Sequence, residues 1–278
     1  MTTTETPYLL GSDPDELRRL EEQAAALAPA TRTILRLAGI GPGMRVLDLG
    51  TGAGDVAFEV ADLVGPGGSV VGVDASAQAL AWAARRTEAR GVPNVSFVHA
   101  DLHDVPITGP FDAVVGRLVL LYTPEPARVL RRYATLVRPG GVFVAMEYEM
   151  SAAGMLPSTP FAERLVHWLT EAFRRSGLDP LLGARLGSVF DAAGLPPAAV
   201  LGLQGYRPPG DPTGARMATG ILRTLEPVLV RTGIATPEEL GLDTLEERFR
   251  RHQDEGELVF RLPTLVGAWA TVEEGHDD

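Results

Sequence analysis

Three glycines at alternate positions follow a short apolar run early in the chain. The run Arg45–Leu49 leads into Gly50, Gly52 and Gly54, and Asp74 ends the next apolar run, 24 residues after Gly50. Glycines here allow a tight turn and close backbone approach to a ligand, and a following helix N-terminus offers free N–H groups. An acid at the end of the second strand can accept hydrogen bonds from both ribose hydroxyls. The spacing therefore predicts a site for a ligand that carries a negative group or a ribose.

Short apolar runs alternate with amphipathic segments from Met44 to Tyr148, a pattern that predicts βα units and a parallel sheet. The predicted strands are Arg45–Leu49, Ser69–Val73, Val95–His99, Phe111–Val115 and Val142–Glu147, and the predicted helices are Gly54–Val64, Ser76–Arg90 and Thr123–Val137. Residues 198–210 add a sixth strand, and residues 257–272 hold a last strand or helix. The expected fold class is α/β, a doubly wound and mostly parallel sheet of seven strands with N-terminal helices and a helical lid.

The rest of the chain is expected to surround this core. A first helix is predicted from Ser12 or Asp13 to a stop at Pro29, and a second ends at Gly39. Residues 1–42 then form a tail and helical cover, residues 43–150 the cofactor-binding core, and residues 151–183 a helical lid. Residues 184–278 complete the sheet and carry a helical insertion at about 208–256.

Composition excludes several classes of function. The formal net charge is −11, with 36 acidic against 25 basic residues, so nucleic acid is not an expected partner. Every basic residue is arginine, which removes Schiff-base chemistry and the lysine motifs of nucleotide-binding loops and short-chain reductases. The chain has no cysteine, no signal-like start and no apolar stretch of roughly 18 residues, so no membrane partner and a cytoplasmic location are expected.

The glycine spacing is G-x-G-x-G rather than the G-x-G-x-x-G of dinucleotide sites. The segments "VLDLGTGAGD" and "VVGVDAS" resemble the class I methyltransferases that use S-adenosylmethionine. "HADLHDVPI", "FDAVVGRLVLLY" and "LVRPGGVFVAMEY" follow in the same order as in that family. The resemblance is detailed from Gly43 to Tyr148 and weaker beyond, and it implies a Rossmann-like methyltransferase fold.

The resemblance also implies which residues bind the cofactor, with S-adenosylhomocysteine as the product. They are Asp48, Gly50, Thr51, Gly52, Asp74, Ala75, Asp101, Leu102 and Arg117. Asp48 and the turn would surround the methionine part, and Arg117 would bring backbone to the same end. Asp74 would hold the ribose, with Ala75 beside the adenine. Asp101 and the backbone N–H of Leu102 would contact the adenine, and Tyr8 and Gln23 are weaker candidates in the N-terminal cover.

The run "HADLHD" places two histidines and two acids close in sequence, but it does not predict a metal site. Asp101 is already assigned to the adenine, and alternate residues leaving a strand diverge. No metal is therefore expected.

Methyl transfer from a sulfonium requires mainly that an acceptor be held in line with the methyl carbon, so no universal catalytic residue is expected. Glu147, at the end of the fifth strand, and His167, in the lid, are the candidates for catalytic groups. On a helical wheel His167 lies opposite an apolar face. The candidates for lining the substrate are Tyr148, Met150, Phe161, Trp168 and Tyr206. Their apolar character favours a small, largely apolar metabolite, by analogy a natural-product intermediate, with an O, N or C acceptor atom.

Three other functions stay open at this point. The same cofactor site can serve a non-methylating rearrangement such as cyclisation, or a regulator that binds the cofactor without turnover. A nicotinamide oxidoreductase is disfavoured by the glycine spacing and the absence of lysine. The expected partner is a small molecule, and the chain is expected to be a monomer or a homodimer.

Overall fold

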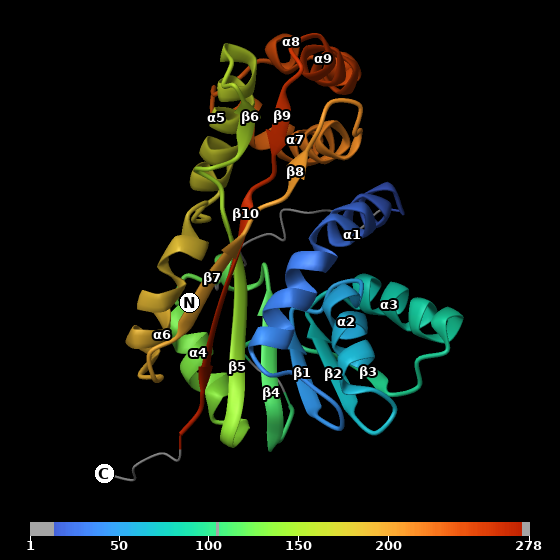
Figure 1. Ribbon diagram of the computed structural model, residues 1–278, viewed down its shortest axis with the longest axis vertical. Coiled ribbons are helices and arrows are strands. Elements are labelled where there is room, and N and C mark those ends of the chain that lie inside the picture. The colour runs from blue at the N-terminus through green and yellow to red at the C-terminus, as the bar shows by residue number, and fades with distance from the viewer. Residues whose placement is uncertain (1–13, 104–105, 274–278) are drawn as a thin grey trace. The chain divides into compact units, whose positions relative to one another are not determined.

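The computed structural model describes residues 14–103 and 106–273 (Figure 1). The helices are α1 (Pro14–Leu37), α2 (Asp55–Val64), α3 (Ala77–Arg90), α4 (Pro126–Ala134), α5 (Pro160–Arg175), α6 (Leu186–Ala193), α7 (Thr213–Arg231), α8 (Pro237–Leu240) and α9 (Leu242–Glu255), with short 3₁₀ helices η1 (Leu120–Tyr122) and η2 (Leu182–Arg185). The strands are β1 (Arg45–Leu49), β2 (Ser69–Asp74), β3 (Val95–His99), β4 (Phe111–Arg117), β5 (Val137–Glu149), β6 (Gly154–Leu156), β7 (Ala199–Leu203), β8 (Tyr206–Arg207), β9 (Val259–Arg261) and β10 (Thr264–Thr271).

The chain divides into two compact units, each built from three segments. The sheet unit comprises Leu27–Glu147, Leu182–Gly202 and Leu265–Asp278. The helical unit comprises Met1–Ala26, Tyr148–Leu181 and Leu203–Thr264.

The sheet unit is built on seven strands in the order β3-β2-β1-β4-β5-β10-β7, which confirms the predicted fold class. The pairs β1 with β2, β2 with β3, β1 with β4 and β4 with β5 are parallel. Sequence order reverses between β1 and β4, so right-handed crossovers place α2 and α3 on one face and α4 on the other. Figure 1 shows α2 and α3 beside β1–β3, and α4 and α6 beside β5 and β7. Ligands of such sheets bind at the carboxyl ends of the strands near this reversal.

The core on the α4 side explains why these segments fold together. Leu47, Phe143, Leu130, Tyr133 and Phe190 are each at most 1% exposed and belong to one apolar cluster. They come from two strands and from α4 and α6. Side chains return to the same face every two residues in a strand and about every 3.6 residues in a helix, and these apolar faces meet in one core. Burial of this kind supplies most of the stability of such a layer.

The helical unit has its own core. α5 packs on α7, and α7 packs on α9. A small antiparallel sheet of order β6-β9-β8 accompanies them. The Gln204 amide donates to the carbonyls of Ala152 and Leu262, which ties the segments around this sheet together. Throughout residues 14–103 and 106–273, the structure contains no helix with the length and apolarity needed to cross a bilayer.

The predicted stop at Pro29 is wrong, because α1 continues through this residue to Leu37. A proline inside a helix removes one backbone hydrogen bond and usually kinks or ends it. Here Leu27, Ile34 and Leu35 on either side of Pro29 are all buried, which offsets that cost. The predicted helix Thr123–Val137 is also too long: α4 begins at Pro126, after the separate turn η1, and its N-cap is Glu125 rather than Thr123.

Candidate functional site

The glycine turn after β1 has a backbone conformation that glycine adopts with little steric cost. Gly50 and Gly52 have φ values of +63° and +52°, in the left-handed region. The Thr51 N–H donates to the carbonyl of Val73 at 2.9 Å, which holds the turn against the end of β2. Gly50 also lies against Val119: a Cβ on Gly50 would come within 2.4 Å of Val119 Cγ2. The turn is therefore fixed on two sides by neighbouring strand ends.

Asp74, at the end of β2, faces this turn. Its Oδ2 accepts from the Gly52 N–H and its Oδ1 from the Ser76 N–H, each at 2.8 Å. Burial raises the pKa of the Asp74 carboxyl, and these backbone hydrogen bonds oppose that rise. Asp74, predicted to hold the ribose, thus lies at the glycine turn, and the ribose assignment stays a prediction.

Asp48 is a buried acid under the same turn. One oxygen, Oδ2, accepts from the Thr51 hydroxyl at 2.6 Å. The other, Oδ1, is buried and has no hydrogen-bond partner among the described residues. Burial raises the pKa of Asp48 to about 7, against the hydrogen bond from Thr51 and the positive charge of Arg117, which lower it. Such an oxygen needs a donor to offset its desolvation, and a ligand ammonium group is a suitable one.

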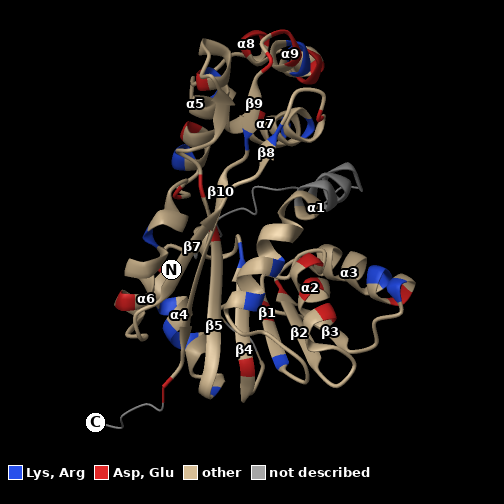
Figure 2. Cartoon of the chain, viewed as in Figure 1, with Lys and Arg blue, Asp and Glu red and all other residues tan. Residues whose placement is uncertain are grey.

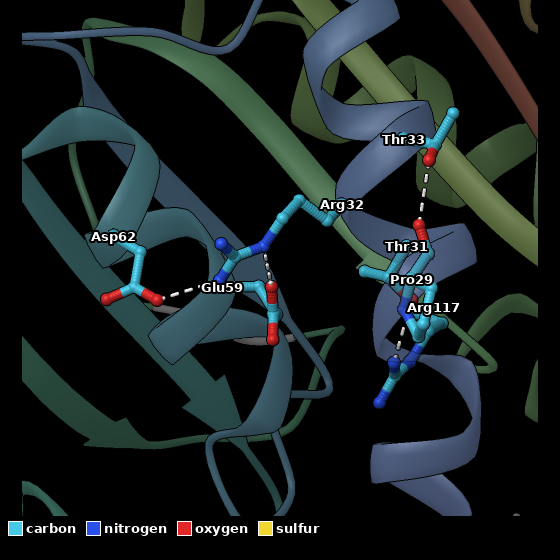
Figure 3. A network of polar contacts seen from close by, with 7 residues as sticks. All are labelled: Pro29, Thr31, Arg32, Thr33, Glu59, Asp62 and Arg117. Atoms are coloured by element: carbon cyan, nitrogen blue, oxygen red, sulfur yellow. Dashed lines mark hydrogen bonds and ion pairs between the residues drawn. The ribbon is translucent and has the colours of Figure 1, made fainter.

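Arg117 reaches from the end of β4 to α1. Its Nη1 donates to the hydroxyl of Thr31 at 2.9 Å, and Thr31 is fully buried (Figure 3). On the same helix Arg32 pairs with Glu59 at 2.7 Å and with Asp62 at 2.8 Å, both on α2 (Figure 3). These contacts hold the second half of α1 against the strand ends and α2.

Arg86 of α3 secures the far side of the glycine turn. Its guanidinium donates to the Ala53 carbonyl and pairs with Asp55 at 2.7 Å. Figure 2 shows acidic positions along α2 and basic ones at the end of α3, where every basic residue is an arginine. The turn is thus held by α3 as well as by β2.

The loop after β3 carries the residues expected at the adenine. Asp101 is exposed, and its Oδ1 accepts from the His103 N–H at 2.7 Å. The Leu102 carbonyl accepts from the Tyr133 hydroxyl at 2.7 Å, and burial raises the pKa of Tyr133 to about 12. His99 Nε2 lies 2.9 Å from the carbonyl of Ala75. The adenine assignments of Ala75, Asp101 and Leu102 stay predictions.

The neighbouring residue Asp104 lies outside the described residues, as does Tyr8, and the side chain of Gln23 is also outside the described part. Within residues 14–103 and 106–273, no group of three or more histidines and acids is placed to hold a metal ion.

Glu147 has a role that the sequence did not indicate. Its Oε1 accepts from the N–H groups of Val119 at 3.0 Å and Leu120 at 2.7 Å. Its Oε2 is buried and has no hydrogen-bond partner in the described part of the chain, and burial raises the pKa of the carboxyl to about 8. Leu118, at the start of this turn, has a φ of +55°, which is uncommon for a residue other than glycine. Glu147 therefore holds a strained turn whose Val119 packs on Gly50.

The lid candidates lie in the helical unit. His167 is on the exposed face of α5, as the helical wheel predicts. Trp168 belongs to the unit's apolar core, and the Phe161 ring packs against Phe249 and His252. Tyr206 on β8 is 54% exposed. Trp168 and Phe161 thus have packing partners of their own.

Tyr148 and Met150, the two other substrate-lining candidates, are buried where β5 ends. The assignment of all five residues to the substrate stays a prediction.

Sequence reasoning missed the residues that position the site. Thr31 and Arg86 lie on helices, where nothing in the local pattern marks them. The turn donors Val119 and Leu120 were missed because they act through backbone N–H groups. Only the three-dimensional arrangement brings Arg86 and Val119 to the glycine turn, Thr31 to Arg117, and Leu120 to Glu147.

The site suits a nucleoside that carries an amino-acid tail. The turn allows close backbone approach, Asp74 can accept ribose hydroxyls, and the unpartnered oxygen of Asp48 can accept from an ammonium group. All of these groups come from the carboxyl ends of β1 and β2. The residues present therefore fit the methionine and ribose parts of S-adenosylmethionine.

Comparison with known proteins supports this interpretation. Residues 40–174 match a family described as a methyltransferase domain. The nocamycin O-methyltransferase of Saccharothrix syringae is 32% identical over 207 residues, 71% of this chain and 66% of that protein. The arsenite methyltransferase of Aquipseudomonas alcaligenes is 40% identical over 107 residues, 36% of this chain and 31% of that protein.

A solved structure, the [4+2]-cyclase SpnF, superposes with a TM-score of 0.53 at 21% identity, covering 88% of this chain and 81% of that one. This likeness concerns the fold alone. The chain spans from about a third to about two thirds of the length of the two curated relatives. The family match, these relatives, the sheet order and the glycine turn agree, and the chain belongs to the class I S-adenosylmethionine-dependent methyltransferases.

Proposed function

We propose that this protein transfers a methyl group from S-adenosylmethionine to a small, largely apolar metabolite. The observation that carries the proposal is the glycine turn lying between two buried acids, Asp48 with an unpartnered oxygen and Asp74 facing Gly52. In a chain of this family, that arrangement is best explained by a nucleoside cofactor with a methionine tail.

The cofactor, when bound, supplies a methyl group activated by its sulfonium. The chain's own contribution is to bind and orient. Asp48 and the backbone of Gly50, Thr51 and Gly52 would hold the methionine part, and Asp74 would hold the ribose. Because these groups are already fixed by hydrogen bonds to β2, little ordering is needed when the cofactor binds.

The acceptor is inferred from a relative that matches 71% of this chain. That relative is named for O-methylation of nocamycin, which supports a small organic acceptor and a place in natural-product biosynthesis. The arsenite methyltransferase covers only 36% of this chain, so its acceptor carries less weight. An oxygen acceptor is our first choice, with nitrogen and carbon as the other possibilities.

Orientation rather than proton abstraction is the proposed source of rate acceleration. Glu147 already accepts from two backbone N–H groups, and His167 lies on the exposed face of α5. Neither arrangement resembles a general base with a free path to an acceptor. Placement of the acceptor in a dry site can provide the larger share of the barrier reduction.

The test is mass spectrometry of the purified chain incubated with S-adenosylmethionine and a panel of apolar hydroxylated and aminated metabolites. The expected result is S-adenosylhomocysteine together with a product heavier by one methyl group. A substrate that isomerises while the cofactor stays unchanged would favour the non-methylating alternative. Absence of cofactor binding would contradict the proposal altogether.

Replacing Asp74 with alanine is expected to weaken binding of S-adenosylhomocysteine by about 100-fold, measured by titration calorimetry. The carboxylate would lose charged hydrogen bonds to the ribose hydroxyls, worth about 1.5–3 kcal/mol each. Asp112→Ala is the matched control, because Asp112 accepts from Arg45 and Arg138 at the opposite ends of the strands. Its affinity should stay within about threefold of the unaltered chain by the same calorimetric measurement. If the two variants bound S-adenosylhomocysteine with equal affinity, Asp74 would not be a ribose-binding residue.

A further inference from the structure

One edge of the seven-stranded sheet is apolar and unpaired. β7 is the last strand in the order of the sheet, so the backbone N–H and C=O groups on its outer side have no neighbouring strand. Among the described residues, no backbone group of residues 199–203 forms a backbone hydrogen bond outside the sheet. Such an edge is a template for a further strand, and the side chains that flank it decide whether one can pair there.

The side chains of β7 do not protect this edge. Its exposed positions are Ala199, Val200 and Gly202, and Val200 is 52% exposed. At the opposite edge of the sheet, the exposed positions of β3 are polar, Ser96 and His99. Charged side chains and prolines are common means of preventing edge-to-edge pairing, and the five residues of β7 include neither. The composition of β7 therefore favours pairing with another strand.

The surface beside β7 also carries little charge. α6 packs next to this strand, and a Cβ on Gly187 would lie 3.7 Å from Val200 Cγ2. Residues 182–203, which contain α6 and β7, include only two charged residues, Arg185 and Asp191, whereas the whole chain has a formal net charge of −11. Figure 2 shows α6 and β7 mostly without charged positions. Two copies of an acidic chain repel each other least where the facing surfaces have no net charge.

We propose that β7 pairs with β7 of a second copy of this chain, so that the two seven-stranded sheets form one continuous sheet across a two-fold axis. An axis perpendicular to the sheet reverses the strand direction, so the two copies of β7 are antiparallel. The same axis keeps both α6 helices on one face of the sheet and makes them antiparallel as well. The inference goes beyond the proposed function, because it concerns how two copies assemble.

Opposite charges near the two ends of α6 favour a second copy as the partner. Arg185 directly precedes α6 and Asp191 lies in its last turn, and both are exposed. In an antiparallel pair of α6 helices, Arg185 comes toward Asp191 of the partner subunit, and the contact occurs twice by symmetry. The other exposed residues of this segment, Ala184, Ser188 and Ala192, are small, so the two helices can approach closely.

The test is the association state of the full chain, measured by sedimentation velocity over a hundredfold range of protein concentration, from about 1 to about 100 μM. The unaltered chain is expected to dimerise with a dissociation constant of about 10 μM or lower. Val200→Lys is expected to weaken dimerisation by at least about 30-fold, because two like charges would meet where the strands pair. Ser96→Lys, on the edge strand β3, is the matched control and should leave the dissociation constant unchanged.

A mixing experiment tests the two-fold arrangement itself. Val200→Glu should be monomeric on its own for the same reason as Val200→Lys. In an antiparallel pair centred on Leu201, residue 200 of one copy is a diagonal neighbour of residue 200 of the other, at about 7–8 Å. An equimolar mixture of the lysine and glutamate variants should therefore form a mixed dimer, and this rescue would show that neither variant is misfolded.

Hydrogen exchange of the unaltered chain needs no substitution. The outward-facing backbone amides of residues 199–203 should exchange at least about fivefold more slowly at the highest protein concentration than at the lowest. The amides of residues 95–99, in β3, should exchange at the same rate at both concentrations.

Each outcome decides the inference. An unaltered chain that stays monomeric over the whole concentration range would overturn the inference and leave the proposed function standing, since cofactor binding is measured separately. A dimer that Val200→Lys leaves intact would place the interface elsewhere and overturn it as well. A mixture of the two charged variants that stays monomeric would exclude the two-fold pairing of β7.

Discussion

A Gly50→Ala variant is expected to lose about 2–5 kcal/mol of unfolding free energy in the absence of ligand. Two costs combine at this position. The φ of +63° places an L-residue in the left-handed region, at about 1–2 kcal/mol, and the new methyl group would meet Val119 Cγ2 at 2.4 Å. Overpacking of this kind costs about 1–3 kcal/mol. Urea denaturation monitored by tryptophan fluorescence would measure the loss.

Gly52→Ala is the matched control for backbone strain. Its φ of +52° is similar, but a Cβ there has no atom within 4 Å. Stability should therefore fall by only about 1–2 kcal/mol. Its methyl group would project where the cofactor is expected to approach, so binding of S-adenosylhomocysteine should fall more than stability does.

A second substitution tests the cause of the Gly50→Ala loss. Val119→Ala in the Gly50→Ala background removes the methyl groups that the new Cβ would meet. The double variant should be more stable than the sum of the two single effects predicts, by about 1 kcal/mol or more. Equal losses in Gly50→Ala and Gly52→Ala, or strict additivity in the double variant, would show that close packing on Val119 does not fix the turn.

The glycine turn could be predicted because its signal is local. Alternating glycines after an apolar strand specify a turn whatever surrounds them, and the acid at the end of β2 follows at a fixed distance. The first three strands were predicted to within one residue for the same reason. Local patterns failed at Pro29, where buried side chains on both sides of the proline decide whether the helix continues.

The positioning residues could not be predicted, because their partners are distant in sequence. Thr31 and Arg117 are 86 residues apart, and Glu147 accepts from residues 27 and 28 positions before it. Such pairs depend on which strand ends become neighbours. Glu147, near the end of β5, was predicted as a candidate catalytic group, whereas its described contacts are with the backbone N–H groups of Val119 and Leu120.

Glu147→Ala is expected to lose about 2–6 kcal/mol of unfolding free energy at pH 5. The N–H groups of Val119 and Leu120 would lose their acceptor in a buried place, which costs about 1–3 kcal/mol for each unsatisfied group. Binding of S-adenosylhomocysteine should weaken as well, since the released turn carries the Val119 contact with Gly50. Thermal unfolding and calorimetry would measure the two effects.

Glu147→Gln separates the charge from the hydrogen bonds. The amide oxygen can still accept from both N–H groups, so the variant should have nearly the stability of the unaltered chain at pH 5. Burial raises the pKa of Glu147 to about 8 from an ordinary value of 4.5. Between these values the folded state retains a proton that the unfolded chain releases. The stability of the unaltered chain therefore falls as pH rises through this window, by about 1.4 kcal/mol per unit for one proton.

The glutamine variant lacks this proton and should show a shallower decline between pH 5 and pH 8. Asp48, whose pKa is raised to about 7, contributes a decline in the same direction in both proteins, so their difference isolates Glu147. Glu149→Gln is the control on the same strand, because the hydrogen bond that Glu149 accepts among the described residues comes from the exposed N–H of Ser151. Glu149→Gln should show the same fall of unfolding free energy with pH as the unaltered chain. If all three proteins lost stability equally between pH 5 and pH 8, the buried charge of Glu147 would not explain the decline.

The same glutamine variant distinguishes a positioning residue from a general base. If Glu147 holds the turn by accepting hydrogen bonds, glutamine preserves that function, and cofactor affinity and turnover should stay within about threefold while alanine loses both. If Glu147 removes a proton from the acceptor, glutamine keeps the affinity but loses about 100-fold or more in kcat. The two contacts with Val119 and Leu120 favour the first result, because a carboxylate that must hold the turn cannot leave it to meet a substrate.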